Sequence, residues 1–432
     1  HIAMKVAKNC RYVEPQFTMR FDKETSEEIW DEALDALGAG ATYPTLYNDD
    51  VNVPAVMYGM RVDEKTAEQY VPFGCTEFVI QGQSTGTPNI CINLLKLLTI
   101  YMNDGIDPID GKRKSGPVSL KKLEEYQTFE EFYDGYKALL DYYLDLSVKA
   151  QYHSYEVMNQ HVSILFTSLL TYDRFARRKA LLDGGVRYLG GTNETYGNIN
   201  TSDSLWVIRD LVFNQKKYTL RQLNDAMLAN FNGYEALRKD CLNCDKYGND
   251  LETADTMAND LYEFVAKGVR DRGIAIGMQY FLIVISNNQL NTEWGNRTAA
   301  SPDGRLSCMY MNPANNPQGG ANKSGPTAML NSLAKFDAKY HGGSVQNIKF
   351  SPSMFNEIRA VIKSLFKTYF AKGGCHLMVT VVDKGVLEDA VEHPENYPDL
   401  IVRVSGFSAV FVDLSPNIQQ ELLSRVLYDK YI

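Results

Sequence analysis

The arrangement of apolar and polar positions predicts a mainly helical chain. Residues 25–37 begin with acidic side chains, carry apolar ones at helical spacing and are followed by Gly38, as is typical of an amphipathic helix. In residues 129–146 large apolar side chains recur at three- and four-residue steps, which predicts one buried helix face. Further helices are predicted over residues 89–103, 220–240 and 254–269.

Strand patterns concentrate towards the C-terminus. Residues 346–352 and 373–382 each have the composition of a strand, and a helix is predicted between them over 354–369, an order that favours a β-α-β crossover. Residues 184–200 are rich in Gly, Asn and Thr. They lack the glycine and lysine spacings of phosphate- and dinucleotide-binding loops, so a plain loop is predicted there.

Length and composition indicate a globular protein. The 432 residues, 44% of them hydrophobic, suffice for one large domain or two to three ordinary ones. The net charge of −9 argues against a nucleic-acid-binding protein. No apolar run reaches membrane-spanning length and the start lacks a signal-peptide layout, so a cytoplasmic location is expected. The first four residues are interpreted as a cloning remnant, or as the middle of a longer protein.

The seven cysteines are scattered and odd in number, which argues against a disulfide framework. Cys241 and Cys244 have CxxC spacing but lack a second pair, so a redox or zinc site is disfavoured. Cys91 and Cys308 are predicted to be core thiols. Cys75 is different, because Gly74 before it predicts a tight turn and the apolar residues after Glu77 predict a strand.

A second motif lies near the C-terminus, where Arg403-Val404-Ser405-Gly406-Phe407-Ser408 sits between apolar runs. A lone Gly in this setting is usually a turn residue. The segment nevertheless resembles the C-terminal signature of the glycyl radical enzymes, and Gly74-Cys75-Thr76-Glu77 resembles their active-site loop. Residues 297–305 and 318–328 resemble two further blocks of that family, in the same order. The separation between Cys75 and Gly406 is also similar to that in the family.

The resemblance implies an α/β fold, namely half of a ten-stranded barrel of glycyl radical enzyme type with long flanking helices. Residues 1–395 would form the C-terminal half-barrel, with the Cys loop at 71–88, and residues 396–432 the glycyl radical domain. By the same resemblance, the N-terminal half of the family fold would be absent from these residues. Because a half-barrel exposes a sheet edge and an apolar lumen, the chain is expected to need a further segment or chain to close it. The resemblance also implies a homodimer.

The same resemblance implies a mechanism. A separate radical S-adenosylmethionine activase with an iron–sulfur cluster would remove a hydrogen atom from Gly406, and the radical would pass to Cys75 as a thiyl. The thiyl would take a hydrogen atom from a small substrate. Neither a metal nor a bound cofactor is expected in this chain. Glu77 lies two residues after Cys75, and in an extended loop both side chains would face the same side, which suits an acid–base role.

The loop also bears on the subclass. The pyruvate formate-lyase branch has two adjacent cysteines, whereas Cys75 here lies between Gly74 and Thr76, so acyl transfer is disfavoured. Glu77 resembles the dehydratase, lyase and decarboxylase branches. Diol dehydratases carry another acidic residue further along this loop, and residues 81–93 contain none, which weakens that assignment. We therefore expect a lyase that breaks a C–O, C–N, C–S or C–C bond. The alternatives are a radical-bearing split subunit, inactive alone, and an unrelated α/β domain.

Overall fold

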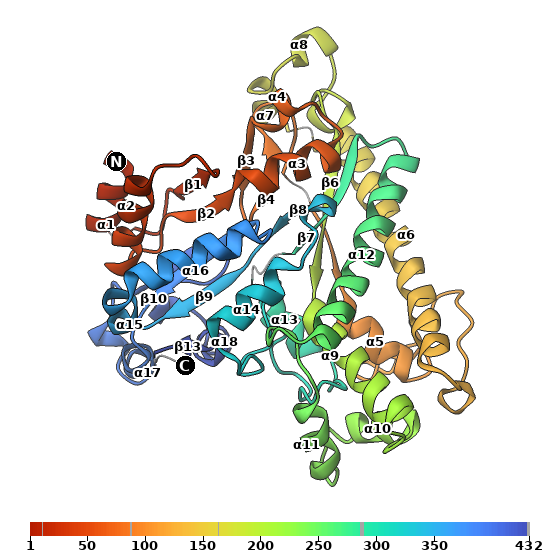
Figure 1. Ribbon diagram of the computed structural model, residues 1–432. Helices are drawn as coiled ribbons and strands as arrows, with labels where there is room; N and C mark the ends of the chain where they lie inside the picture. Colours follow the sequence, from red (N-terminus) through yellow and green to blue (C-terminus); the bar gives the residue numbers. More distant parts are fainter. Residues whose placement is uncertain (11, 87–88, 163, 286–288, 430–432) are drawn as a thin grey trace.

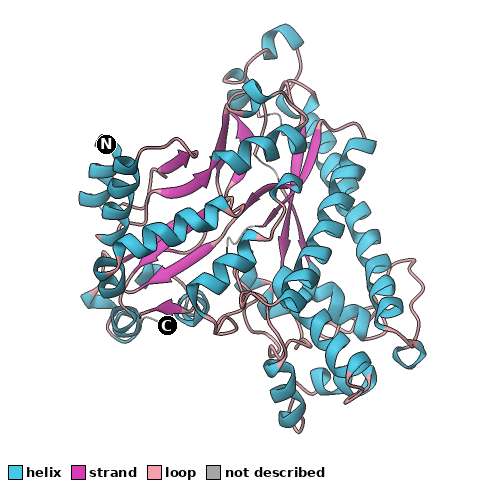
Figure 2. Cartoon of the chain, in the orientation of Figure 1, coloured by secondary structure: helices cyan, strands magenta, loops and turns pink. Residues whose placement is uncertain are grey.

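A computed structural model describes residues 1–10, 12–86, 89–162, 164–285 and 289–429 (Figure 1). Residues 87 and 88 of the predicted Cys loop lie outside these ranges, as do residues 430–432 of the predicted glycyl radical domain. Two β-sheets and two β-hairpins occupy the centre of the molecule, and helices surround them (Figure 2).

The first sheet has four parallel strands in the order β5-β6-β7-β8. Their bounds are Ile90–Asn93, Gly190–Tyr196, Tyr280–Ile285 and His341–Ser344. Strands β6, β7 and β8 are buried along their whole length, as expected for parallel strands that are covered on both faces. Side chains on these three strands are therefore shielded from solvent, whereas β5 is half-buried.

The second sheet has five strands in the order β1-β2-β10-β9-β13. Their bounds, in the same order, are Thr18–Phe21, Thr45–Asn48, His376–Val381, Asn347–Phe350 and Leu427–Tyr428. All neighbours are parallel except β2 and β10. Strand β9 begins three residues after β8 ends, so the two sheets adjoin at this point.

Two antiparallel hairpins complete the β structure, and each carries one of the sequence motifs. Strands β3 (Tyr70–Phe73) and β4 (Glu77–Ile80) form the first hairpin, with Cys75 at its tip. Strands β11 (Ile401–Arg403) and β12 (Ser408–Val410) form the second, with Gly406 at its tip.

The longest helices, α6 and α12, pack against each other, and α12 also covers β7 (Figure 1). None of the helices within the described ranges is long and apolar enough to cross a membrane. The helices are α1 Ile2–Asn9, α2 Glu27–Gly38, α3 Asp49–Met60, α4 Glu64–Ala67, α5 Leu94–Met102, α6 Phe129–His161, α7 Leu165–Leu169, α8 Arg174–Arg177, α9 Asn198–Val207, α10 Leu220–Leu228, α11 Glu235–Asn243, α12 Glu252–Ala275, α13 Leu290–Glu293, α14 Gly325–Ala334, α15 Pro352–Glu357, α16 Arg359–Ala371, α17 Lys384–Glu392 and α18 Pro416–Ser424.

Several predicted elements are confirmed. Helices α2 and α6 lie where the apolar periodicity placed them, and α6 continues to His161. The crossover from β9 through α15 and α16 to β10 is parallel, as predicted. The single helix predicted over 220–240 is instead two helices, because Gly233, with a φ of 80°, lies in the turn between α10 and α11.

Two predictions for the first sheet are wrong. Residues 90–93, assigned to a helix, form β5, and the loop predicted over 184–200 contains β6 and the start of α9. Strand β6 is hydrogen-bonded to β5 on one side and to β7 on the other. A side chain at Gly191 would come within 2.7 Å of the Phe281 ring. Tertiary pairing thus selects a strand from a sequence of low intrinsic strand preference.

Candidate active site

The tip of the β3–β4 hairpin is a three-residue turn that carries Cys75. Phe73 pairs with Glu77 across the hairpin, so Gly74, Cys75 and Thr76 make the turn. Gly74 and Thr76 have φ values of 52° and 90°, a region that residues other than glycine seldom occupy. The predicted tight turn is confirmed. The extended course assumed between Cys75 and Glu77 is wrong, because the chain reverses direction there.

This turn lies against strand β8. Thr76 is fully buried, and a side chain at Gly343 would come within 2.6 Å of the Thr76 carbonyl carbon. The Phe78 ring meets the His341 ring edge-on, with 5.2 Å between their centroids. The glycine at position 343 therefore allows the close approach that seats the hairpin on the sheet.

The tip of the β11–β12 hairpin holds Gly406 in a buried turn. The backbone N–H of Val404 donates to the Phe407 carbonyl at 3.1 Å. Two side chains from distant segments bind the turn: Arg425 donates to the Val404 carbonyl at 2.6 Å, and Gln16 donates to the Gly406 carbonyl at 2.9 Å. The turn is thus fixed by tertiary contacts as well as by its own backbone.

The tips of the two hairpins touch. A Cβ atom built on Gly406 would lie 2.6 Å from Cβ and 2.7 Å from Sγ of Cys75, closer than non-bonded atoms approach. Gly406 is not among the glycines with positive φ, so its backbone conformation does not explain the glycine. The close approach to Cys75 does, and the structure brings together two residues that are far apart in sequence.

The surroundings of Cys75 favour an uncharged thiol. Burial raises the pKa of the thiol well above its ordinary value, and the nearby Glu77 and Glu194 raise it further, while Arg403 opposes them. The thiol is therefore protonated at neutral pH. Such a group carries a hydrogen atom, as hydrogen-atom transfer requires, and is a poor ionic nucleophile.

Glu77 lies buried beside the turn, with 4% of its surface exposed. Burial raises the pKa of its carboxyl from 4.5 to about 8, and the negative charge of Glu194 acts in the same direction. Oε1 accepts a hydrogen bond from Asn89 Nδ2 at 3.1 Å. Oε2 has no hydrogen-bond partner among the described residues. Glu77 thus holds a proton near neutral pH and has one oxygen available.

Further residues beside Glu77 were not predicted from the sequence. Glu194 lies on β6 and accepts a hydrogen bond from Asn89 Nδ2 at 2.8 Å, so one amide bridges two carboxyl groups. Thr192 and Tyr196 flank Glu194 at alternate positions of β6. Thr192 donates a hydrogen bond to Asn89, and Tyr196 donates one to Glu194. The polar residues at every second position of 192–196 could have indicated a strand with one polar face. They were overlooked because residues 184–200 were predicted to form a loop.

Comparisons with known proteins agree with this geometry. The sequence pattern of the pyruvate formate lyase-like family matches residues 1–290, which contain Cys75 and Glu77, and the glycine radical pattern matches residues 311–412, which contain Gly406. The chain belongs to the pyruvate formate lyase-like family of glycyl radical enzymes. A glycine radical domain implies a radical that an activase installs.

Relatives of this glycyl radical protein include dehydratases. It is 29% identical over 428 residues to trans-4-hydroxy-L-proline dehydratase of Clostridioides difficile, a match that covers 98% of this chain and 54% of the relative. It is 28% identical over 427 residues to (2S)-3-sulfopropanediol dehydratase of Klebsiella oxytoca, covering 96% of the chain and 51% of the relative.

A solved structure confirms the α/β fold of the family. The glycerol-bound form of the B12-independent glycerol dehydratase from Clostridium butyricum matches with a TM-score of 0.93 and 28% identity. The match covers 99% of this chain and 54% of that structure. The glycyl radical chain described here therefore spans about half the length of the relatives it matches.

The other cysteines of this family member carry no comparable site. All seven cysteines are free. Burial raises the pKa of Cys241 to about 12 and that of Cys244 to about 11, the opposite of what a reactive CxxC thiolate needs. Cys308 is exposed, so its assignment as a core thiol is wrong, because it lies in a surface turn. Cys91 is half-buried and faces Glu194, with 3.8 Å between Sγ and Oε2.

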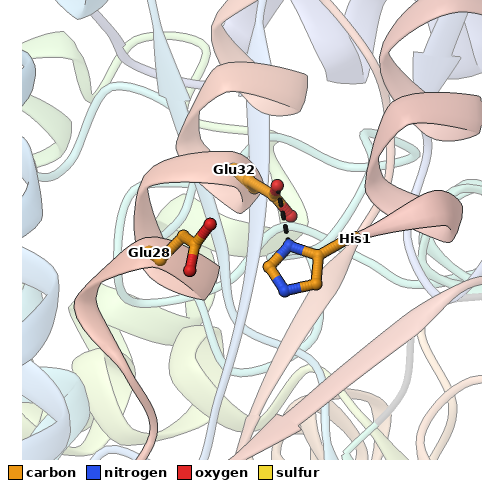
Figure 3. A group of neighbouring side chains, drawn as sticks. All are labelled: His1, Glu28 and Glu32. Carbon is orange, nitrogen blue, oxygen red and sulfur yellow. Dashed lines mark hydrogen bonds and ion pairs between the residues drawn. The ribbon is translucent and has the colours of Figure 1, made fainter.

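A group of potential metal ligands lies elsewhere in the molecule. His1, Glu28 and Glu32 cluster at α1 and α2, and His1 Nδ1 lies 2.8 Å from Glu32 Oε1 (Figure 3). His1 and Glu28 are exposed, and neither helix carries a residue of the Cys75 site. His1 Nδ1 and Glu32 Oε1 bond to each other, and Glu28 lies beside them on the surface.

Proposed function

We propose that this chain carries the radical store and the hydrogen-atom relay of a glycyl radical lyase. The contact between Gly406 and Cys75 is the observation that carries the proposal. A radical on the Gly406 α-carbon takes the hydrogen atom of the Cys75 thiol, which leaves a thiyl on sulfur. The thiyl then takes a hydrogen atom from a C–H bond of the substrate and becomes a thiol again.

Glu77 has the acid–base role in this scheme. Because its pKa is about 8, it holds a proton at neutral pH and can deliver that proton to a leaving group next to the substrate radical. Loss of a protonated hydroxyl or amine leaves a product radical, which recovers a hydrogen atom from Cys75. The reaction is thus an elimination or a related C–O, C–N, C–S or C–C cleavage. Gly74 and Thr76 flank Cys75, so acyl transfer through paired cysteines is disfavoured.

The radical requires a partner enzyme. We infer that a separate radical S-adenosylmethionine activase with an iron–sulfur cluster installs it under anaerobic, cytoplasmic conditions, and that the chain itself binds no further cofactor. Gly406 is buried against Cys75. The activase can therefore reach the α-carbon only after the tips of the two hairpins separate.

Electron paramagnetic resonance after anaerobic activation tests this assignment. The wild-type protein is expected to give the doublet of a glycyl radical. Gly406→Ala is expected to abolish the doublet, whereas Cys75→Ser is expected to keep the doublet and abolish turnover. The same doublet from Gly406→Ala would place the radical on another residue and overturn the assignment.

A second candidate function is that of a radical-bearing subunit that is active only with another polypeptide. Helix α8 projects from the body of the molecule at the top of Figure 1, and α7 lies below it near α4. Their region exposes an unusually large set of apolar side chains for a protein in water. This α7–α8 surface consists of Val162, Leu165, Phe166, Leu169, Leu170, Tyr172 and Phe175, each 51% to 74% exposed.

We propose that the α7–α8 surface packs against the polypeptide that supplies the remaining half of the relatives' length, in the same chain or in a second one. The completed barrel would then form a homodimer. Mass analysis of the natural gene product decides between the two arrangements, since a longer polypeptide removes the split-subunit alternative.

A pair of surface variants tests the docking surface in the assembled protein. Phe166→Asp is expected to weaken assembly in size-exclusion chromatography, or to lower the melting temperature when both halves share one chain. Val361→Asp changes an exposed apolar residue on α16 and serves as the control. Equal behaviour of the two variants would contradict the docking role.

A further inference from the structure

Four polar side chains, three from β6 and one from the residue before β5, meet beside Glu77. Thr192, Glu194 and Tyr196 occupy alternate positions of β6 and therefore share one face of the sheet. Asn89 immediately precedes β5, the strand that pairs with β6. All four belong to one hydrogen-bonded array that ends at Glu77.

Asn89 is at the centre of this array, and its amide is fully engaged. Nδ2 donates to Glu77 Oε1 at 3.1 Å and to Glu194 Oε1 at 2.8 Å, while Oδ1 accepts from Thr192 Oγ1 at 2.5 Å. An amide nitrogen has two hydrogens, and both point to carboxyl oxygens. Rotation of the amide by 180° would lose both of these donated hydrogen bonds, so the observed orientation is favoured.

Glu194 is held from its other side. Its Oε2 accepts a hydrogen bond from the Tyr196 hydroxyl at 2.5 Å, and Cys91 Sγ lies 3.8 Å from the same oxygen. Only 5% of Glu194 is exposed, and its strand is paired on both sides. A central strand places a side chain more firmly than a loop does.

We propose that Glu194 is a positioning residue of the active site: together with Asn89 it fixes Oε1 of Glu77 and leaves Oε2 free to exchange a proton beside Cys75. The proposal rests on the acid–base role proposed for Glu77. Oε2 has no hydrogen-bond partner among the described residues, and it lies 3.2 Å from the point where a Gly74 Cβ would stand.

The charges around Glu77 come from several elements. Glu194 on β6 is the charged group that acts on Glu77, and the backbone N–H groups of Cys75 and Glu77 also interact with its carboxyl. Glu77 in turn raises the pKa of Cys75 and of Tyr47 on β2, on both of which Arg403 of β11 has the opposite effect. Glu194 favours the protonated form of Glu77, whereas the Asn89 hydrogen bond favours the ionised form. Removal of Glu194 should therefore lower the pKa of Glu77, whereas removal of Asn89 should raise it.

Infrared titration of the purified full chain tests the proposal without radical or substrate. The carboxylic-acid C=O band that disappears in Glu77→Gln identifies Glu77, and its wild-type midpoint is expected near pH 8. Asp203→Asn identifies the band of a second buried carboxyl, whose pKa burial raises to about 7, and should leave the Glu77 midpoint unchanged.

Two variants then give the decisive comparison. Glu194→Gln keeps the shape and the acceptor but removes the charge, and is expected to lower the Glu77 midpoint by about 1 pH unit. Asn89→Ala removes the donor and is expected to raise the midpoint. Glu194→Asp keeps the charge and should stay close to wild type. If these substitutions only loosened the site, the Glu77 midpoint would shift downwards in both Glu194→Gln and Asn89→Ala, towards the ordinary carboxyl pKa.

An unchanged midpoint in Glu194→Gln, or a downward shift in both Glu194→Gln and Asn89→Ala, would overturn the positioning role. If Glu194→Gln fails to fold, an absent or downward shift in Asn89→Ala still overturns it. The proposed lyase function fails separately, through the absence of a Gly406 doublet or of turnover. The two failures are therefore distinguishable.

Discussion

The tips of the two hairpins that meet in the active site are held in different ways. The Cys75 turn is shaped locally, by two residues with positive φ and by pairing between Phe73 and Glu77. The Gly406 turn depends on Gln16 and on Arg425, one from near each end of the chain. In the proposed mechanism, Cys75 as the relay residue can be rigid through its own backbone, whereas Gly406, which the activase would have to reach, is better held by contacts that can be released.

The largest expected effect is the dependence of stability on pH that Glu77 gives to the Cys75 hairpin. The pKa of Glu77 is raised from 4.5 to about 8 in the folded state, so its contribution to stability is complete below pH 4.5 and is lost as pH rises through 8. Between these limits the free energy of unfolding of wild type is expected to fall by about 4–5 kcal/mol relative to Glu77→Gln. Urea unfolding at pH 5, 7 and 9 measures this, and parallel pH dependences would contradict it.

Arg425→Ala should have the largest effect on the Gly406 turn. Arg425 forms two bonds to Glu421, a carboxylate with 2% of its side chain exposed, and also binds the Val404 carbonyl. Removal leaves a buried charge unpaired, so the free energy of unfolding is expected to fall by about 3–5 kcal/mol. Urea unfolding measures this loss, and hydrogen exchange of the Gly406 amide should accelerate.

An exposed ion pair provides the control for Arg425→Ala. Lys149 lies 2.7 Å from Asp145 on the surface of α6, and Lys149→Ala should cost less than about 0.5 kcal/mol. A similar small loss in Arg425→Ala would mean that the Gly406 turn does not depend on its tertiary contacts.

Gly74→Ala tests whether the Cys75 turn is shaped by its own backbone. The φ of 52° costs a residue with a side chain about 1–2 kcal/mol, and the new Cβ would also press on Glu77 Oε2 at 3.2 Å. Gly111→Ala is the matched control, because Gly111 has a φ of 69° with no atom within 4 Å of the added Cβ. In urea unfolding, Gly74→Ala should lose more stability than Gly111→Ala. The reverse order would contradict the idea that the Cys75 turn requires glycine at position 74.

Gln16→Ala is expected to have the smallest effect. It removes one hydrogen bond to the Gly406 carbonyl, worth about 0.5–1.5 kcal/mol. Global stability should change little, but the Gly406 amide should exchange faster with solvent while the backbone amide of Cys75 keeps its rate. Equal acceleration at both hairpins would show that they open as one unit.

Local patterns predicted some of these features well. The apolar periodicity of α6 and the strand-helix-strand order around α16 were read correctly, because both signals lie within short segments. The tight turn at Gly74 was also predicted from one residue. In contrast, β6 was missed because its residues are polar or small, and its strand form comes from pairing with β5 and β7.

The sequence by itself determined which residues had to be considered: Cys75 and Glu77 in one motif, Gly406 in another, and the family resemblance that links them. Only the tertiary structure decided that Gly406 touches Cys75 and that Glu194 reaches Glu77 through Asn89. The physical reason is that such contacts join strands and turns far apart in the chain. They form only when the sheets assemble, and no local pattern of side chains encodes them.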